Sequence, residues 1–434
     1  MHHSNKREFL VDRSVTIRQL GNNTLVRILG AVSGFLLTIY AARVMGTEDA
    51  GRFFWASNVV LGFGFVCKWG LEIVMTRLVA LDKDNDLRTN ELLWQGMILS
   101  GGTAILLAAI SVIFASIFAD SVFPDKAYLK VFLLAMFCVL PFSLQAPVCG
   151  VLRGQHKQGE GAFVEKAGQS VFLLLSLYLL TQSGVINAEN ALWANVVVCV
   201  VVLMIGLYIT KALNTKNNKP KLSLKIHPEL IKGGGALVIN NLAGFLVNWG
   251  CGIMLAWYVA ADEVAVFVCA QRISSCITII FAIFAATYGS YMPLLYSGRK
   301  FDELGKLIIR GTRNIILASF PFVLLLLVLP SEVMRFMGED YAHGAKYLVC
   351  LMLGQVFTMV TGLAGLLLAM AGKEYVMRNI GVGVAVFMIV CGWLVIPRFG
   401  SMGAAVVTTI GMFIQGAMYV YMVEAGLGVK YLRT

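Results

Sequence analysis

Twelve long apolar stretches constrain the fold of this 434-residue chain more than any other feature of its sequence. A helix of about 20 apolar residues, rising about 1.5 Å per residue, crosses the roughly 30 Å hydrocarbon core of a bilayer. The stretches are too long to be strands of a membrane barrel, so we expect helices. They lie at about residues 22–44, 53–79, 92–118, 129–152, 162–181, 191–211, 234–258, 264–292, 314–336, 346–370, 379–397 and 402–423. Because 58% of the residues are apolar and only 14% are charged, the sequence predicts an all-α polytopic membrane protein with twelve transmembrane helices.

The longest polar stretch divides the predicted helices into two sets of six. It covers residues 211–232, near the middle of the chain, and contains six lysines. A polar segment of this kind is typical of a linker between compact parts. We therefore predict an N-terminal lobe over residues 1–210 (helices 1–6), a cytoplasmic linker over 211–232 and a C-terminal lobe over 233–434 (helices 7–12).

Positive charge is distributed unevenly over the segments between the predicted helices. If the N-terminus lies inside, the inner segments hold 23 Lys and Arg residues and the outer ones hold seven. Loops rich in Lys and Arg stay on the cytoplasmic side, so both termini are predicted to be cytoplasmic. Most of the net charge of +11 follows from this bias. It favours contact with anionic membrane lipids and gives no reason to expect a nucleic-acid partner.

We expect no removable signal peptide, because no short apolar stretch with a cleavage site precedes the first span.

Arg27, Lys68 and Glu72 place charge within the first two apolar stretches. A charge at the bilayer centre costs about 2.5–3.5 kcal/mol on insertion scales, so charges kept there usually face a partner or a substrate. Counted along ideal helices, Arg27 and Lys68 both lie about 8 Å from the same membrane face. Two cations at one depth on adjacent helices predict a pocket for an anion, and Glu72 borders it. The alternative is a local Lys68–Glu72 ion pair at i,i+4 that neutralises itself.

Arg272 is the most distinctive charged residue of the second half. It lies about eight residues into the stretch 264–292, roughly 12 Å from the outer face. Asn248 on the preceding helix reaches a similar depth, and Asn241, one heptad earlier, shares its face. No acid lies at helical spacing beside Arg272, so we predict that these three residues form a substrate-facing polar wall. The alternative is an arginine satisfied by backbone carbonyls or by Asn248 for packing alone.

No residues in the sequence have the spacing of a metal site or a catalytic group. The nine cysteines all lie within apolar stretches and are interpreted as small buried residues rather than disulfides. We therefore expect no catalytic residue, no metal and no cofactor, and we do not expect an enzyme.

Three short segments carry a resemblance to a known family. They are GTEDAGRF at residues 46–53, AQRI at 270–273 and FGSMGAA at 399–405. Together with the chain length, the number of spans and the halfway linker, they resemble the Wzx-type polysaccharide flippases of the MOP exporter superfamily. The MATE multidrug transporters and the lipid II flippases belong to the same superfamily.

The resemblance implies a MOP/MATE-like fold and the translocation of an undecaprenyl-pyrophosphate-linked oligosaccharide, such as an O-antigen repeat unit for lipopolysaccharide. Transport would run from the cytoplasmic to the periplasmic leaflet of the bacterial inner membrane by alternating access. Lipid II flippases place arginines on the first, second and eighth helices in a central cavity. Arg27 and Arg272 match this pattern by helix, whereas Lys68 replaces the arginine of the second. Coupling to H⁺ or Na⁺ and association with a polysaccharide polymerase complex are further expectations.

Two alternatives stay open on the sequence alone. A MATE-like ion-coupled drug antiporter would share the fold, but a site for cationic drugs is expected to bury acids rather than arginines. A membrane-embedded polysaccharide polymerase would need loops that present catalytic groups at the membrane surface. The predicted outer loops, such as 120–127 and 182–190, are only turns.

Overall fold

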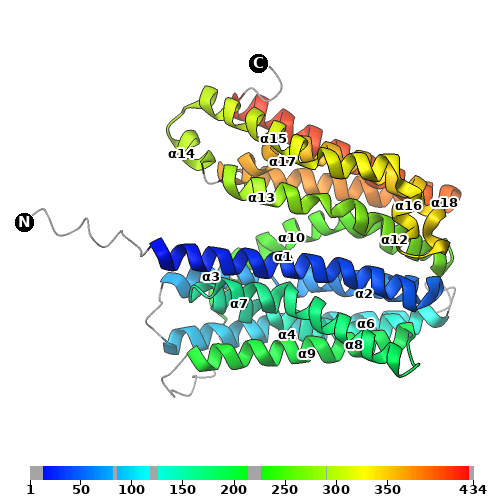
Figure 1. The fold of residues 1–434 in the computed structure, drawn as a ribbon. Helices are drawn as coiled ribbons and strands as arrows, with labels where there is room; N and C mark the ends of the chain where they lie inside the picture. The colour runs from blue at the N-terminus through cyan, green and yellow to red at the C-terminus, as the bar shows by residue number, and fades with distance from the viewer. Residues whose placement is uncertain (1–12, 82–85, 118–125, 214–225, 290, 430–434) are drawn as a thin grey trace, which may run out of the picture. The chain divides into compact units, whose positions relative to one another are not determined.

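The computed structural model describes residues 13–81, 86–117, 126–213, 226–289 and 291–429. Every regular element within these ranges is a helix, and Figure 1 labels most of the α-helices by their order in the chain. The chain divides into two compact units, each with its own set of helices and parts of helices.

Unit 1 holds the described residues of Met1–Leu37, Phe63–Ile117 and Leu133–Val238. Within it α8 packs against α9, and α3 against α4. Small residues permit close packing, since a Cβ on Gly30 would lie only 3.1 Å from the Cα of Ala167. Its helices, complete or in part, are α1 (Arg13–Val44), α2 (Gly46–Cys67), α3 (Leu71–Leu81), α4 (Asp86–Ile117), α6 (Lys126–Gly154), α7 (Gln158–Ala162), the π-helix η1 (Phe163–Ala167), α8 (Gly168–Gln182), α9 (Ala188–Leu213) and α10 (Pro228–Phe245).

Unit 2 holds the described residues of Thr38–Gly62, Phe118–Phe132 and Ile239–Thr434. Within it α17 packs against α15 and α18. It contains the remaining parts of α1, α2, α6 and α10, followed by the π-helix η2 (Leu246–Gly250), α11 (Cys251–Leu255), α12 (Ala261–Ser275), α13 (Ile277–Gly289), α14 (Met292–Ser297), α15 (Phe301–Val328), α16 (Pro330–Arg335), the 3-10 helix η3 (Glu339–Gly344), α17 (Ala345–Met370) and α18 (Glu374–Leu427).

Eleven helical segments of the described chain are long and apolar enough to cross a membrane. The last of them, α18, has 54 residues, more than twice the length that a bilayer of about 30 Å requires. Its backbone leaves the helical conformation at Gly400, with φ 53° and ψ −136°. α18 therefore consists of two helices, which match the predicted stretches 379–397 and 402–423. The prediction of an all-α polytopic membrane protein is confirmed, and all twelve predicted stretches are helical over most of their length.

The second predicted helix, residues 53–79, is wrong as a single element. α2 ends at Cys67 and α3 begins at Leu71, with a three-residue turn between them. Trp69 and Gly70 in this turn have φ of 51° and 58°, the left-handed conformation that commonly ends a helix. Glycine adopts this conformation without steric cost, but a bulky residue such as Trp69 rarely does. The turn therefore places Lys68 at the end of one helix rather than in the middle of a longer one.

Residues 46–51, which lie between the predicted stretches 22–44 and 53–79, form the first turns of α2. The chain reverses at Gly46, whose φ is 73°. Glu48 and Asp49 then lie in the first turn of the helix, where acidic side chains stabilise the positive end of the helix dipole. Arg52 pairs with both of them across one helical turn. The two acidic residues after Gly46 are therefore signals of a helix start.

The division into lobes 1–210 and 233–434 stays a prediction. Residues 214–225 of the predicted linker lie outside the described residues. The two compact units have boundaries of their own, since unit 2 combines Thr38–Gly62 with Ile239–Thr434.

Candidate functional site

The six predicted site residues fall into two groups of three, one in each compact unit. A single cavity lined by all six therefore stays a prediction. Unit 1 holds Arg27, Lys68 and Glu72, and unit 2 holds Asn241, Asn248 and Arg272.

Arg272 is half-buried in the last turn of α12. Its Nη1 donates a hydrogen bond of 3.0 Å to the Oγ1 of Thr38 on α1. Its guanidinium carbon lies 4.7 Å from the centre of the Phe54 ring on α2, a distance that permits a cation–π interaction. Among the described residues, no ion pair joins Arg272 to an acidic side chain. The guanidinium thus keeps its charge uncompensated and retains N–H donors that can bind an anion.

Thr38 and Phe54 are partners of Arg272 that the sequence reasoning missed. A signal for Thr38 was present, because it lies eleven residues after Arg27 on the same helix. Eleven residues are about three turns, so the two side chains share one face of α1. Phe54 gave no such signal, since aromatic residues are common throughout the apolar stretches.

Asn248 lies in η2 and contacts the Arg272 region through its backbone. Its side-chain Nδ2 donates 2.8 Å to the carbonyl of Gly244, one turn earlier, while its own carbonyl accepts a hydrogen bond from the Gln271 side chain. The alternative in which Asn248 satisfies Arg272 is therefore not what the structure shows. Asn241 is half-buried on α10, and its predicted contact with substrate stays a prediction.

Two buried amides add polar capacity near Arg272. Asn58 on α2 is fully buried, and neither its Nδ2 nor its Oδ1 has a hydrogen-bond partner within the described part of the chain. The Oε1 of Gln271 also has none there. Both amides face Gly252, because a Cβ built on this glycine would lie 3.3 Å from Gln271 Oε1 and 3.9 Å from Asn58 Nδ2. An unmade buried hydrogen bond costs about 1–3 kcal/mol, so this region favours occupation by water or another polar molecule.

Lys68 in unit 1 has a different environment. Its Nζ lies 3.5 Å from the centre of the Phe142 ring on α6, a close cation–π contact. The predicted local ion pair with Glu72 is not formed within 4.0 Å between these two described residues. The physical reason is the break at residues 68–70, since α2 and α3 are separate helices and the i,i+4 geometry is lost.

Glu72 belongs to a group of four charged side chains, Lys68, Glu72, Arg153 and Glu165, which we call the charge cluster. Arg153 at the end of α6 forms an ion pair with Glu165 of η1. Glu72 lies within electrostatic range of the other three, and its Oε2 is buried without a hydrogen-bond partner in the described structure. The cluster contains two basic and two acidic side chains, so its formal charges sum to zero.

Arg153 and Glu165 were absent from the predicted site. Arg153 directly follows the predicted stretch 129–152, and Glu165 lies near the start of the predicted stretch 162–181. The π-helical turn η1 brings Glu165 to Arg153, and no pattern in the sequence indicates a π-helix at this position.

Arg27, the remaining predicted site residue of unit 1, is an exposed side chain on α1.

The described residues contain no group of three or more His, Cys, Asp or Glu side chains arranged to hold a metal ion. The side chains of the two sites offer electrostatic and hydrogen-bonding interactions. The Arg272 site offers positive charge with amide donors and acceptors nearby, whereas the charge cluster is already neutral.

The fold is shared with membrane transporters of the MOP superfamily. It superposes on an inward-facing conformation of a multidrug resistance MATE family transporter with a TM-score of 0.74 and 13% identity, covering 93% of this chain and 98% of that one. The lipid II flippase MurJ in an inward closed conformation gives a TM-score of 0.71 and 11% identity, with 93% and 87% of the two chains covered. At these identities the likeness shows the fold alone.

The sequence comparison is more specific. Residues 17–289 match the family described as "Polysaccharide biosynthesis protein", and the chain belongs to this family. A relative from Haloferax volcanii, the "Probable low-salt glycan biosynthesis flippase Agl15", is 23% identical over 414 residues, which cover 94% of this chain and 83% of the relative. The resemblance to polysaccharide flippases of the MOP superfamily is confirmed at this level.

Proposed function

We propose that this protein is a flippase that moves a lipid-linked oligosaccharide across the membrane by alternating access. Membership of the polysaccharide biosynthesis protein family and a MOP-type transporter fold support this proposal. The observation that carries it within the molecule is Arg272, a half-buried guanidinium held by a hydroxyl and an aromatic ring instead of a carboxylate. Such a group binds the phosphate oxygens of a lipid carrier well, because its planar fork reaches two oxygens at once.

Two other observations weigh against the alternatives. A binding site for cationic drugs is expected to present unpaired acids, whereas the acids of the charge cluster are accompanied by two cations. A polymerase would need catalytic groups on loops at the membrane surface, and the connections between α1 and α2 and between α8 and α9 are short turns.

The second part of the proposal concerns the identity of the substrate and the direction of its transport. We infer an undecaprenyl-pyrophosphate carrier bearing a repeat unit such as that of O-antigen, moved from the cytoplasmic to the periplasmic leaflet of a bacterial inner membrane. Arg27 and Lys68 lie in the inner half of the membrane in this proposal, and Arg272 lies in the outer half. Asn241, Asn248 and Glu72 border the path, and the pyrophosphate exchanges one cation for the next as the protein alternates between inward and outward access.

The proposal includes further parts that follow from the sequence. Both termini lie in the cytoplasm, the lobes 1–210 and 233–434 move against each other about the linker 211–232, and transport is coupled to H⁺ or Na⁺. Reporter fusions within 81–91, 211–232 and 296–313 test the orientation, and an external signal from any of them contradicts it.

The decisive experiment is profiling of lipid-linked oligosaccharides in a strain that lacks the gene. A flippase deletion accumulates single, unpolymerised lipid-linked repeat units in the cytoplasmic leaflet. Complementation with the wild-type chain restores surface glycan, whereas complementation with Arg27→Ala or Arg272→Ala does not, at unchanged protein level. If the deletion strain shows no such accumulation, the proposed function is wrong.

A further inference from the structure

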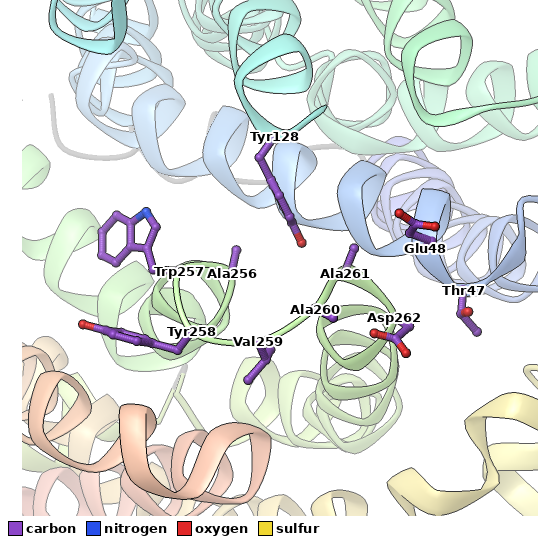
Figure 2. A pocket seen from close by; sticks show the side chains of 10 residues that line it. All are labelled: Thr47, Glu48, Tyr128, Ala256, Trp257, Tyr258, Val259, Ala260, Ala261 and Asp262. Carbon is purple, nitrogen blue, oxygen red and sulfur yellow. The ribbon is translucent and has the colours of Figure 1, made fainter. Parts of the chain in front are cut away.

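A cavity of about 670 Å³ lies in unit 2, apart from the residues that contact Arg272. It lies where the beginnings of α2 and α6 meet the segment between α11 and α12, and Figure 2 shows the side chains around it. In the predicted topology this is the outer end of the helices. The volume falls within the range of about 300–1,000 Å³ that is usual for small-molecule sites. The polar and aromatic side chains around the cavity are Thr47, Glu48, Tyr128, Trp257, Tyr258 and Asp262.

One side of the cavity is aromatic. Trp257 and Tyr258 lie in the turn after α11 and are 42% and 37% exposed, and in Figure 2 their rings lie on the opposite side of the segment 259–261 from Glu48 and Asp262. Tyr128 is buried and packs edge-on against Trp55, with ring centres 5.1 Å apart. The indole nitrogen of Trp55 in turn donates 3.1 Å to the carbonyl of Ile253. The Tyr128 part of the aromatic wall is therefore fixed by contacts from behind.

The other side carries the carboxylates of Glu48 and Asp262. Glu48 forms an ion pair with Arg52, and Asp262 Oδ1 accepts a hydrogen bond of 2.8 Å from the backbone nitrogen of Glu263 at the start of α12. Each carboxylate keeps lone pairs that can accept further hydrogen bonds. None of the ten lining residues is basic, so the cavity does not suit a phosphate.

The start of α12 is held rigidly next to this cavity. A Cβ on Gly51 would lie 1.8 Å from the carbonyl oxygen of Ala261, so α2 and α12 are in backbone contact there. Glu263 accepts hydrogen bonds of 3.0 Å from Tyr347 and from Ser401, and these tie α12 to α17 and α18. A site on such a frame is preorganised, which lowers the entropic cost of binding.

We propose that this cavity binds a neutral sugar of the oligosaccharide head group. The inference rests on the proposed function and adds the part of the substrate that Arg272 does not address. A pyranose ring presents apolar C–H faces, which pack on the faces of Trp257 and Tyr258. Hydroxyl groups of a neighbouring sugar in the oligosaccharide donate to Glu48 and Asp262 on the other side of the segment 259–261. Within unit 2, Arg272 then recognises the pyrophosphate by charge. The cavity recognises a sugar by aromatic packing and hydrogen bonds.

The test is sugar binding by the purified full-length protein in lipid nanodiscs, followed by saturation-transfer difference NMR. The probes are the methyl glycosides of glucose, galactose and N-acetylglucosamine at millimolar concentration. We expect saturation of the ring C–H protons of at least one probe, with a loss of about fivefold or more in the double variant Trp257→Leu/Tyr258→Leu. Leucine keeps the apolar bulk that would anchor these positions at a membrane interface but removes the ring. Trp257→Phe/Tyr258→Phe is expected to keep most of the signal, and it reports on folding of the site.

Trp94→Leu is the matched control, because Trp94 is also 42% exposed but lies on α4 in unit 1. It should leave the signal unchanged. Absence of transfer to every probe, an equal signal from the leucine double variant, or binding of tetraphenylphosphonium at this site in place of sugars would each overturn the inference. Loss of sugar binding with intact export of lipid-linked oligosaccharide would refute this site alone. A deletion strain without accumulated lipid-linked repeat units would refute the proposed function, and the NMR result would be unaffected.

Discussion

Arg272 in unit 2 and the charge cluster in unit 1 both keep basic side chains within apolar helices, but they handle the charge in opposite ways. Arg272 contacts the Thr38 hydroxyl and the Phe54 ring, neither of which carries a charge. In the cluster, Arg153 is ion-paired with Glu165, and Glu72 accompanies Lys68. The positive charge of Arg272 therefore remains available to an anion. The positive charges of the cluster are accompanied by the acids Glu72 and Glu165.

This difference teaches that a buried cation is not by itself a substrate ligand. Lys68 and Arg272 are equivalent in the sequence, since each is a basic residue within a predicted span. Their neighbours decide their roles, because an anion gains most from a charge that no protein carboxylate has already compensated. We therefore expect loss of function to dominate for changes at Arg272, and loss of stability to dominate for changes in the cluster.

The largest effect is expected for Arg272→Ala. Hydrogen bonds to charged groups contribute about 1.5–3 kcal/mol each, so we expect a loss of transport of about tenfold to hundredfold at normal protein level. Arg272→Lys should retain part of the rate, because it keeps the charge but loses the bidentate fork. The measurement is the initial rate of translocation of lipid-linked oligosaccharide in proteoliposomes. A wild-type rate in the alanine variant would remove the contrast between the two regions.

Arg153→Ala should act mainly on stability. It leaves Glu165 and Glu72 with Lys68 as their only cation in the described cluster, and we expect a loss of about 1–3 kcal/mol in unfolding free energy. This is below the value for a fully buried pair, because the Glu165 side chain is 39% exposed. Membrane abundance should fall several-fold, as measured by immunoblot and by thermal unfolding. The double variant Arg153→Met/Glu165→Met should recover much of the abundance; transport loss at full abundance would instead indicate a direct role in the substrate path.

Lys68→Met is expected to have a smaller effect, because Lys68 combines a cation–π contact with a place in a neutral cluster. Cation–π contacts contribute about 0.5–2 kcal/mol, so the transport rate should fall by about two- to thirtyfold. Phe142→Leu removes the ring and keeps the lysine, and it separates the two roles in the same assay. Equal losses in both variants would show that Lys68 acts through packing, whereas a loss in Lys68→Met alone would support its place in the pyrophosphate path.

The smallest effect is expected for Glu72→Gln. The substitution keeps the shape of the side chain, and no hydrogen bond to Oε2 is lost because none is formed within the described residues. We expect transport within about twofold of wild type. A loss as large as that of Arg272→Ala would mean that Glu72 takes part in transport, and the charge cluster would then have to be treated as functional.

The fold followed from the sequence more completely than the site did. The twelve apolar stretches are helical because a bilayer leaves no other way to satisfy their backbone groups. The boundaries at 46–51 and 53–79 were wrong for local reasons. Glu48 and Asp49 are as typical of a helix start as of a loop. Trp69 adopts the left-handed backbone conformation, which is rare for a bulky residue.

The sequence by itself determined the class of the protein, the number of apolar helices, the family resemblance and the identity of the charges that require explanation. That a charge lies within an apolar stretch is visible in the sequence, because it depends on the residues next to it along the chain. Only the tertiary structure decided which of these charges is compensated. Thr38 and Phe54 are 234 and 218 residues away from Arg272 in sequence, and a π-helical turn brings Glu165 to Arg153. Electrostatic balance depends on distance in space, and helix packing sets that distance.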